Sequence, residues 1–349
     1  MGKRKKHTPF YKRKSFLWTT GSIVGVILCI LLLFRLTPWP GAMIIRIVFN
    51  KGGVQTLRNM EKHVPNVPIT VLSDQSYRSG DNDAKLDVFF PDSIKATSQK
   101  LPTIIWTHGG AWLSGDKTND TPYFKLLTAQ GYTIVALNYS LAPNHRYPTA
   151  VHQLNDAYKY IQQNADRFHV DINKFFLAGD SAGAQLSAQM AALITNPDYA
   201  RQVSVTPNMK PGQLRGVILN CGIYQMKLLA QPDPTLPRIV GWGDDVSVWA
   251  YSGTKDFDDP VIHEMSPYFH VTHSFPPTYI TGGNGDPLTK VQSIPLAKKL
   301  ESLGVEVTRL FYPDNHQPSL PHEYQFNLDN ADGQNALSAT LGFVQDHIE

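Results

Sequence analysis

Short apolar runs alternate along the chain with longer segments in which apolar residues recur at helical spacing. The apolar runs predict strands at residues 69–73, 85–90, 102–107, 131–138, 175–178, 216–220, 277–281 and 305–312. The longer segments predict helices at residues 122–130, 150–165, 182–195, 291–303 and 333–347. Strands that alternate with helices in this way form right-handed βαβ units. We therefore expect an α/β fold in which helices cover both faces of a mostly parallel sheet.

One long segment interrupts this alternation. Residues 224–269 are rich in proline, aspartate and tryptophan and show no clear periodicity. A loop of this length inside a compact domain usually has a function. We expect it to form a cap that shapes a substrate pocket.

The amino-terminal region follows a different pattern. Residues 16–34 carry no charge, and a helix of that length would span roughly 28 Å, close to the ~30 Å hydrocarbon core of a membrane. The run is longer than a usual signal core and no small-residue cleavage pattern follows it, which favours an uncleaved membrane anchor over a cleaved secretory signal. A nuclear-import signal would explain only the basic residues that precede the run.

The segment after the apolar run predicts two further helices. Residues 41–64 have helical character on both sides of Gly52-Gly53, where we expect a break. The first helix is more apolar than a solvated helix needs to be. It could lie in the membrane interface, fold over an active-site mouth as part of a lid, or pack against the domain.

The charge distribution predicts an orientation in the membrane. Of the 32 Lys and Arg residues, seven fall within the first fourteen positions, which leaves 25 basic against 29 acidic residues in the remainder. This mildly acidic remainder does not indicate nucleic-acid binding. By the positive-inside rule the basic tail stays in the cytoplasm and the domain lies outside. Cys29 falls in the apolar run and Cys221 in the body, so we expect no disulfide, which favours the surface of a single-membrane bacterium.

A glycine-flanked serine marks the candidate centre of the chemistry. Residues 175–178 predict a buried strand, residues 182–195 predict a helix, and the sequence Gly179-Asp-Ser181-Ala-Gly183 joins them. Such a turn exposes the serine hydroxyl above a helix amino terminus, where negative charge is favoured. This placement suits a nucleophile for acyl transfer, although the five-residue pattern also arises by chance and a buried turn serine is the alternative.

A pair of glycines follows an earlier strand. Residues 102–107 run into His108-Gly109-Gly110-Ala-Trp112. Consecutive glycines let backbone N–H groups turn inward, although they also occur simply where a turn needs positive φ. Because they precede the serine by one strand and one helix, Gly109 and Gly110 are candidates for an oxyanion hole.

A serine nucleophile needs a base and a carboxylate that orients the base. In a parallel sheet such groups collect at the carboxyl ends of the strands. Asp286 follows the strand at 277–281, and His316 and His322 follow the strand at 305–312. This gives the chain order Ser, Asp, His.

The carboxylate and the base each have rivals. We favour Asp286 over three other aspartates, Asp180, Asp156 and Asp314, because it follows a strand through a glycine-rich turn and is fixed by Pro287. We favour His322 over His316 because the extended segment before His322 would carry it across the mouth of the site. Both histidines stay candidates. No cluster has metal-ligand spacing and no dinucleotide or phosphate motif is present, so we predict neither metal nor cofactor.

Four motifs together resemble the fold-3 group of α/β hydrolases, the hormone-sensitive-lipase-like carboxylesterases. They are His108-Gly-Gly-Ala-Trp112, Tyr139-Ser-Leu-Ala-Pro143 with Tyr147-Pro148, Gly179-Asp-Ser-Ala-Gly183 and Asp286-Pro-Leu288, and the resemblance covers roughly residues 67–349. It implies the α/β-hydrolase fold, Ser181 as nucleophile, oxyanion N–H donors on Gly109, Gly110 and Ala182, and hydrolysis of small-molecule esters with short acyl chains. The chain departs from the family pattern at Ala111, where a third glycine is usual, and around the base, where His-Gly-Phe is usual.

These interpretations divide the chain into four parts: a basic cytoplasmic tail at 1–15, a transmembrane helix at 16–36, juxtamembrane or lid helices at 37–66, and a hydrolase domain at 67–349 with the cap inserted at about 224–269. A carboxylic ester hydrolase is the favoured function. The alternatives are an O-deacetylase of cell-surface polysaccharide, suggested by the outside location, and a catalytically silent binding protein.

Overall fold

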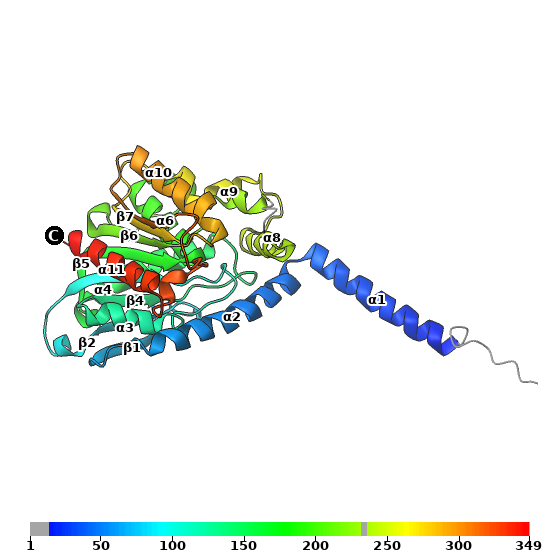
Figure 1. The fold of residues 1–349 in the computed structure, drawn as a ribbon, viewed down its shortest axis with the longest axis horizontal. Helices are drawn as coiled ribbons and strands as arrows, with labels where there is room; N and C mark the ends of the chain where they lie inside the picture. The colour runs from blue at the N-terminus through cyan, green and yellow to red at the C-terminus, as the bar shows by residue number, and fades with distance from the viewer. Residues whose placement is uncertain (1–13, 232–235, 349) are drawn as a thin grey trace, which may run out of the picture.

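The computed structural model describes residues 14–231 and 236–348 (Figure 1). Residues 1–13, which hold most of the basic tail, and residues 232–235 of the expected cap lie outside the described residues. The strands are β1 (Ile69–Ser76), β2 (Lys85–Pro91), β3 (Leu101–Thr107), β4 (Thr133–Leu137), β5 (Val170–Asp180), β6 (Leu214–Asn220), β7 (Thr278–Gly282) and β8 (Val307–Phe311).

These strands form one sheet in the order β1-β2-β4-β3-β5-β6-β7-β8. β2 pairs antiparallel with β1 and with β4, and the other neighbours run parallel. The expected mostly parallel sheet is therefore confirmed. The α-helices are α1 (Lys14–Leu36), α2 (Trp39–Glu61), α3 (Thr121–Ala129), α4 (Thr149–Gln163), α5 (Ala165–Phe168), α6 (Ser181–Thr195), α7 (Pro197–Gln202), α8 (Arg238–Ser252), α9 (Pro260–Glu264), α10 (Ile294–Ser302) and α11 (Ala331–Asp346).

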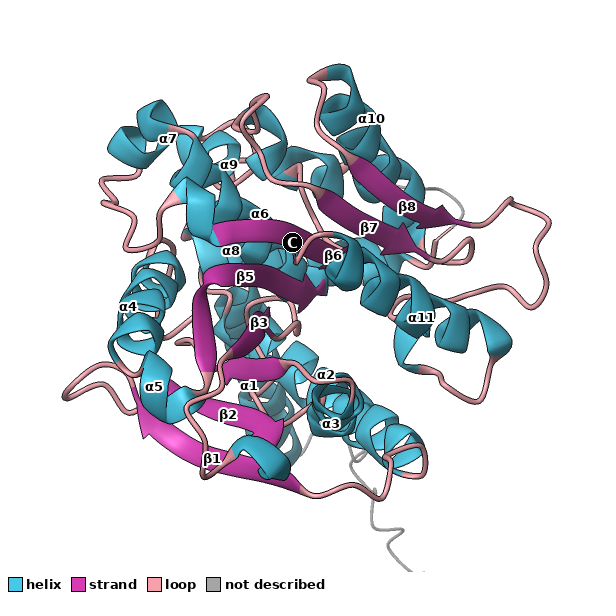
Figure 2. Ribbon diagram, turned by 90° about the vertical axis from the view of Figure 1, so that its left-hand side faces the viewer, coloured by secondary structure: helices cyan, strands magenta, loops and turns pink. Residues whose placement is uncertain are grey.

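Helices cover both faces of the sheet (Figure 2). Successive strand residues point to opposite faces, as the period of a β-strand requires. Ile105 and Leu177 belong to the larger core cluster, together with residues of α4 and α6. Ile104 and Phe176 belong to a second cluster, with residues of α3 and α11. The continuous apolar runs at the central strands are thus explained by burial on both sides.

The segment after α1 differs from the expectation. It forms one continuous helix, α2, which runs through Gly52-Gly53 without a break. The prediction of two short helices is therefore wrong. Each helical glycine costs about 1 kcal/mol relative to alanine, but α2 packs along the body and buries Ile45 and Met60. Figure 1 shows α2 lying along the domain while α1 extends away from it.

The expected cap is more regular than its sequence suggests. The described part of residues 224–269 contains the helices α8 and α9, and two short 3₁₀ segments at Met226–Ala230 and Pro267–Phe269. α8 lies beside the first half of α2, and a Cβ added to Gly41 of α2 would lie 2.9 Å from Val246 of α8. The close approach of these two helices accounts for the glycine at this point of α2.

Candidate active site

Ser181 stands at the junction of the strand β5 and the helix α6. Its φ of +48° lies in the left-handed region, which non-glycine residues rarely adopt. The turn is possible because its neighbours are small: a Cβ added to Gly183 would lie 1.9 Å from the carbonyl oxygen of Thr107 on β3. Ser181 is 8% exposed and lines a cavity. A strained, nearly buried serine at such a turn is typical of a nucleophile elbow.

The loops that follow β7 and β8 bring a carboxylate and an imidazole together. The Gly285 N–H donates to the carbonyl of Leu320, and the Leu320 N–H donates to Oδ1 of Asn284, each at 2.9 Å. These bonds fasten the two loops to each other. As a result Asp286 Oδ2 lies 2.9 Å from Nδ1 of His322. Asp286, His322 and Ser181 all line the same cavity.

The alternative histidine lies elsewhere. His316 places its Nε2 2.9 Å from Oδ2 of Asp332, at the start of α11, and packs against the ring of Tyr312. It is absent from the lining of the cavity that holds Ser181. Of the two candidates, the structure therefore brings only His322 to Asp286.

The two expected oxyanion glycines differ in their hydrogen bonds. The Gly109 N–H donates to Oδ2 of Asp180 at 2.8 Å. The expectation that this N–H faces a substrate is therefore wrong, because a buried carboxylate already occupies it. Gly110 and Ala111 have φ values of +106° and +53° and line the cavity, and their N–H groups donate to no acceptor within the described residues.

The third expected donor, Ala182, lies in the first turn of α6. N–H groups in the first turn of a helix have no intrahelical acceptor. The sequence pointed to glycines, but backbone direction and not residue size determines which N–H groups are free. Ala111 is the residue that sequence reasoning missed at this turn.

Two buried carboxyl groups, Asp180 and Asp120, and the partly exposed Glu323 lie near the elbow. Asp180 is buried, and its carboxylate also accepts a hydrogen bond from Trp106 Nε1 at 3.0 Å. Burial, together with nearby Asp120 and Glu323, raises the pKa of Asp180 well above its usual value. Burial and then Glu323 raise the pKa of Asp120 to about 8. The Asp180 carboxyl thus holds the glycine turn through Gly109 and strand β3 through Trp106.

Carboxylates also set the charge of His322. Burial opposes the imidazolium form, but Asp286 and then Glu323 and Asp244 outweigh it and raise the pKa of His322 to about 9. Oε1 of Glu323 lies 3.7 Å from Nε2 of His322. Burial also raises the pKa of Asp244 to about 7. Neither Glu323 nor Asp244 was identified from the sequence, although Glu323 stands where the family pattern has glycine.

Cys221 completes a compact group with Asp286 and His322, whose possible ligand atoms all lie within 4.8 Å of one another. The donor set fits a metal poorly. Asp286 and His322 already bond to each other, and burial raises the pKa of the Cys221 thiol well above its usual value. A cysteine binds metals as the thiolate, which this environment disfavours.

The cavity above these groups has a volume of about 670 Å³. Its floor is formed by the glycine turn, Ser181 and His322. Its walls are largely apolar and come from α2 and α8, with Ile45, Phe49 and Trp242 among them. The segment expected to shape the pocket therefore does line it, and α2 lines it as well.

Comparison with known proteins identifies a matching family and several similar esterases. The family model BD-FAE matches residues 86–300, more than half of the chain. Esterase LipC of Mycobacterium tuberculosis is 28% identical over 196 residues, which cover 56% of this chain and 47% of that protein. Acetyl esterase of Salmonella paratyphi B is 26% identical over 208 residues, 56% of this chain and 58% of that protein. The chain spans about half the length of the curated relatives it matches.

Solved structures share the fold. Esterase B of Lactobacillus rhamnosis superimposes with a TM-score of 0.73 at 20% identity, over 87% of this chain and 94% of that one. The esterase of Pyrobaculum calidifontis gives a TM-score of 0.67 at 20% identity, over 88% and 94%. With its eight-stranded sheet, its serine elbow and the match to the family model, this chain belongs to the BD-FAE family of α/β hydrolases.

Proposed function

We propose that this protein is a serine hydrolase that cleaves carboxylic esters. The observation that carries the proposal is the meeting of Ser181, His322 and Asp286 at one cavity, with Nδ1 of His322 2.9 Å from Asp286. Relatives named esterase and acetyl esterase support the same reaction class. In this proposal Ser181 is the nucleophile, His322 the general base and Asp286 the group that orients the base.

The proposed reaction has two steps. Because Nδ1 of His322 is held by Asp286, Nε2 takes the proton of the Ser181 hydroxyl as Oγ bonds to the ester carbonyl carbon. The intermediate collapses, the bond to the alcohol oxygen breaks, and the alcohol leaves with that proton. A water molecule then repeats the sequence on the acyl-enzyme and releases the acid.

Three backbone N–H groups are proposed to hold the oxyanion: those of Gly110, Ala111 and Ala182. The first two line the cavity and lack an acceptor among the described residues, and the third lies in the first turn of α6. Donors already in place where charge develops lower the barrier without reorganisation, and each is typically worth 10²–10³ in kcat.

Covalent labelling tests the proposal. A fluorophosphonate probe should label the intact protein at Ser181, and Ser181→Ala should lose labelling together with about 10⁶-fold of p-nitrophenyl acetate hydrolysis. Ser247 is a matched control, because it lines the same cavity but donates its hydroxyl to the Gly243 carbonyl of its own helix. Ser247→Ala should keep the label. Substantial hydrolysis by Ser181→Ala would overturn the proposal.

The apolar walls favour an acyl group over a sugar in the cavity. Esters with an apolar acyl group are therefore the proposed substrates, in preference to acetylated polysaccharide. Comparing p-nitrophenyl acetate and butyrate with an acetylated xylan separates the two possibilities. Faster release of acetate from the glycan would overturn the preference.

We also propose that α1 anchors the protein as a single membrane span with the hydrolase domain outside. Phe16–Leu36 is long and apolar enough to cross a membrane, and none of its most apolar window is buried in the protein. A cleaved signal sequence has the same properties, so the two are distinguished by experiment. The full chain should resist alkaline carbonate extraction from membranes, and protease added to intact cells should cut the domain. Recovery of a soluble protein that lacks residues 1–36 would overturn the proposal.

A further inference from the structure

The entrance of the cavity is surrounded by exposed apolar side chains. Five of them, from α2 and α8, form what we call the apolar rim: Ile44 (45% exposed), Ile47 (56%), Val48 (58%), Ile239 (65%) and Val240 (36%). All except Ile47 also line the cavity. Soluble proteins rarely expose apolar side chains in such a group without a binding function.

The helix α2 is held with its rim residues facing outward. Arg46 lies between the rim residues Ile44 and Ile47 in sequence and points to the body, where it donates to the carbonyls of Leu113 at 2.5 Å and Ala142 at 2.8 Å. Ile45 is buried on the same side. Because both inward contacts are fixed, the apolar face of α2 cannot turn inward to cover Ile47 and Val48.

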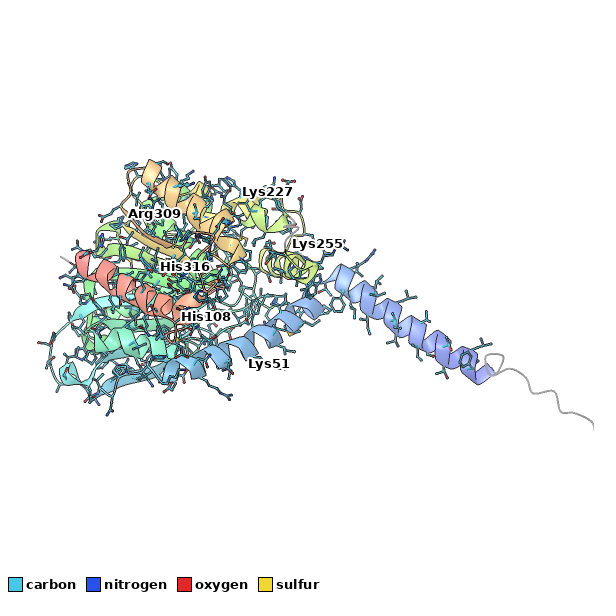
Figure 3. The ribbon with its side chains drawn as sticks, viewed as in Figure 1. Lys51, His108, Lys227, Lys255, Arg309 and His316 are labelled. Carbon is cyan, nitrogen blue, oxygen red and sulfur yellow. The ribbon has the colours of Figure 1, made fainter. Side chains whose placement is uncertain are left out.

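The rim lies where the chain leaves the proposed membrane span. α1 ends at Leu36 and α2 begins at Trp39, so only two residues separate them. Figures 1 and 3 show α1 leaving the body close to α8 and the first turns of α2. The rim is therefore next to the bilayer surface whenever α1 crosses the bilayer.

Side chains at this junction are of the interfacial kind. Trp39 is 43% exposed. Lys255, labelled in Figure 3 near the junction, donates to the Arg35 carbonyl and places its ammonium 3.8 Å from the ring centre of Trp249. Tryptophan and basic residues are enriched where protein meets lipid headgroups. The chemistry at the junction thus agrees with a lipid surface as the partner of the rim.

We infer that the apolar rim rests on the lipid surface from which α1 emerges, and that the cavity takes the acyl chain of a membrane-resident ester directly from the bilayer. The second half of this inference rests on the proposed function, and the first half does not. The substrate class is an acylglycerol-like lipid ester. Its acyl chain would pass between α2 and α8 to reach Ser181, while the ester carbonyl stays at the glycine turn.

The position of the rim is tested without reference to activity. The full-length protein is prepared in phosphatidylcholine vesicles with an environment-sensitive fluorophore attached at Ile47→Cys. The control carries the fluorophore at Val71→Cys, and both proteins also carry Cys29→Ser. Val71 is 39% exposed on the edge strand β1, away from α1 in Figure 1. Nitroxide-labelled acyl chains should quench the probe at position 47 several-fold more than the probe at 71.

Two results would overturn the membrane contact. In the first, labelled lipid quenches the probe at position 47 no more than the probe at position 71, so the rim is in water. In the second, the probe at position 47 is shielded from water-soluble quenchers but is not quenched by labelled lipid, so the rim contacts a second copy or another protein.

The substrate class is tested by a ratio of rates. Wild-type protein in vesicles should hydrolyse a long-chain diacylglycerol held in the bilayer as well as soluble p-nitrophenyl acetate. Ile47→Asp should lower the ratio of the first rate to the second by about fivefold or more, since an apolar side chain that is buried in lipid is replaced by a charge. Val71→Asp should leave the ratio unchanged.

The outcomes separate the two proposals. Acetate hydrolysis without diacylglycerol hydrolysis, or an unchanged ratio in Ile47→Asp, would overturn the lipid substrate while the esterase stands. Loss of both activities in the wild type would overturn the esterase, and the quenching experiment would still decide whether the rim contacts lipid.

Discussion

His322 lies among three acidic groups, Asp286, Glu323 and Asp244, and their charge determines the pH at which its imidazole becomes neutral. A general base must be neutral to accept the proton of the serine. With a pKa of about 9, His322 is mostly protonated at neutral pH. The proposed esterase activity should therefore rise with pH until about pH 9.

Removing one of these acidic groups should shift the pH dependence of kcat/KM. Glu323→Gln replaces the carboxylate whose Oε1 lies 3.7 Å from Nε2 of His322 with a neutral group of the same shape. The imidazolium loses a favourable charge, the pKa of His322 falls, and the acid limb of the kcat/KM profile should shift to lower pH. Glu301→Gln, at an exposed position of α10, is the control and should leave the limb in place. An upward shift for Glu323→Gln would contradict this electrostatic account.

The two histidine candidates give opposite expectations. His322→Ala removes the proposed base and should lower kcat by about 10⁴–10⁶. His316→Ala removes a hydrogen bond to Asp332 outside the cavity. It should lower stability by about 1 kcal/mol and leave kcat within a few-fold. Rates of p-nitrophenyl acetate hydrolysis and thermal unfolding of both variants measure the difference. Equal losses of kcat would contradict the assignment.

The sequence predicts which candidate site residues follow the carboxyl ends of strands, but not how the loops that carry them contact one another. The positions of Ser181 and Asp286 after the carboxyl ends of two strands, β5 and β7, could be read from apolar runs and turns. The choice between His316 and His322 depends on how two loops fasten to each other, through Gly285 and Leu320. Which N–H of the glycine turn is free depends on the carboxylate of Asp180. Contacts between segments far apart in sequence decide both, and no local pattern records them.

At the scale of elements, the elbow depends on the contact between α6 and the end of β3. Gly183→Ala would place a methyl group 1.9 Å from the Thr107 carbonyl, a backbone atom that cannot move aside cheaply. The variant should lose about 1–3 kcal/mol of stability and, because Ser181 shifts with α6, most of its activity.

A second glycine variant serves as the control. Gly342 lies in the helix α11, and a Cβ added there meets nothing within 4 Å. Gly342→Ala should be neutral or stabilise by about 0.5–1 kcal/mol. Denaturant midpoints measured for both variants test the difference. A Gly183→Ala variant as stable and active as the parent would contradict the close-packing account.

The elements that the sequence misjudged are both outside the sheet. Gly52-Gly53 indicated a break, yet α2 continues because packing of Ile45 and Met60 against the body outweighs the local preference. Residues 238–252 showed no clear periodicity, yet they form α8 because one side contacts α2 and the other lines the cavity. Strands buried on both faces are recognised from their continuous apolar runs. A helix that contacts the body on one side and the cavity or solvent on another has no simple apolar periodicity, so the sequence predicts it less well.

For the whole molecule, the apolar helix α1 extends away from the hydrolase body, whereas α2 belongs to that body. Deletion of residues 1–37 removes α1, whose most apolar window has no buried residue. The remainder should stay folded, leave the membrane fraction and keep its rate on p-nitrophenyl acetate within a few-fold. Fractionation followed by activity measurement checks this.

A longer deletion should behave differently. Removing residues 1–62 also takes away α2, with buried Ala42 and Met60 and with one wall of the cavity. This variant should aggregate or unfold at lower temperature. If it were as stable and active as the shorter deletion, α2 would have to be a peripheral segment and not part of the body.

The two-residue link between α1 and α2 fixes how far the catalytic centre can reach. Thr37 and Pro38 together span at most about 7 Å, and α2 is pinned to the body by Arg46. A domain tethered so tightly cannot swing outward on a stalk. In the proposed anchored arrangement it operates at one height above the headgroups, and a substrate far from the bilayer has to descend to that height before it can be cleaved.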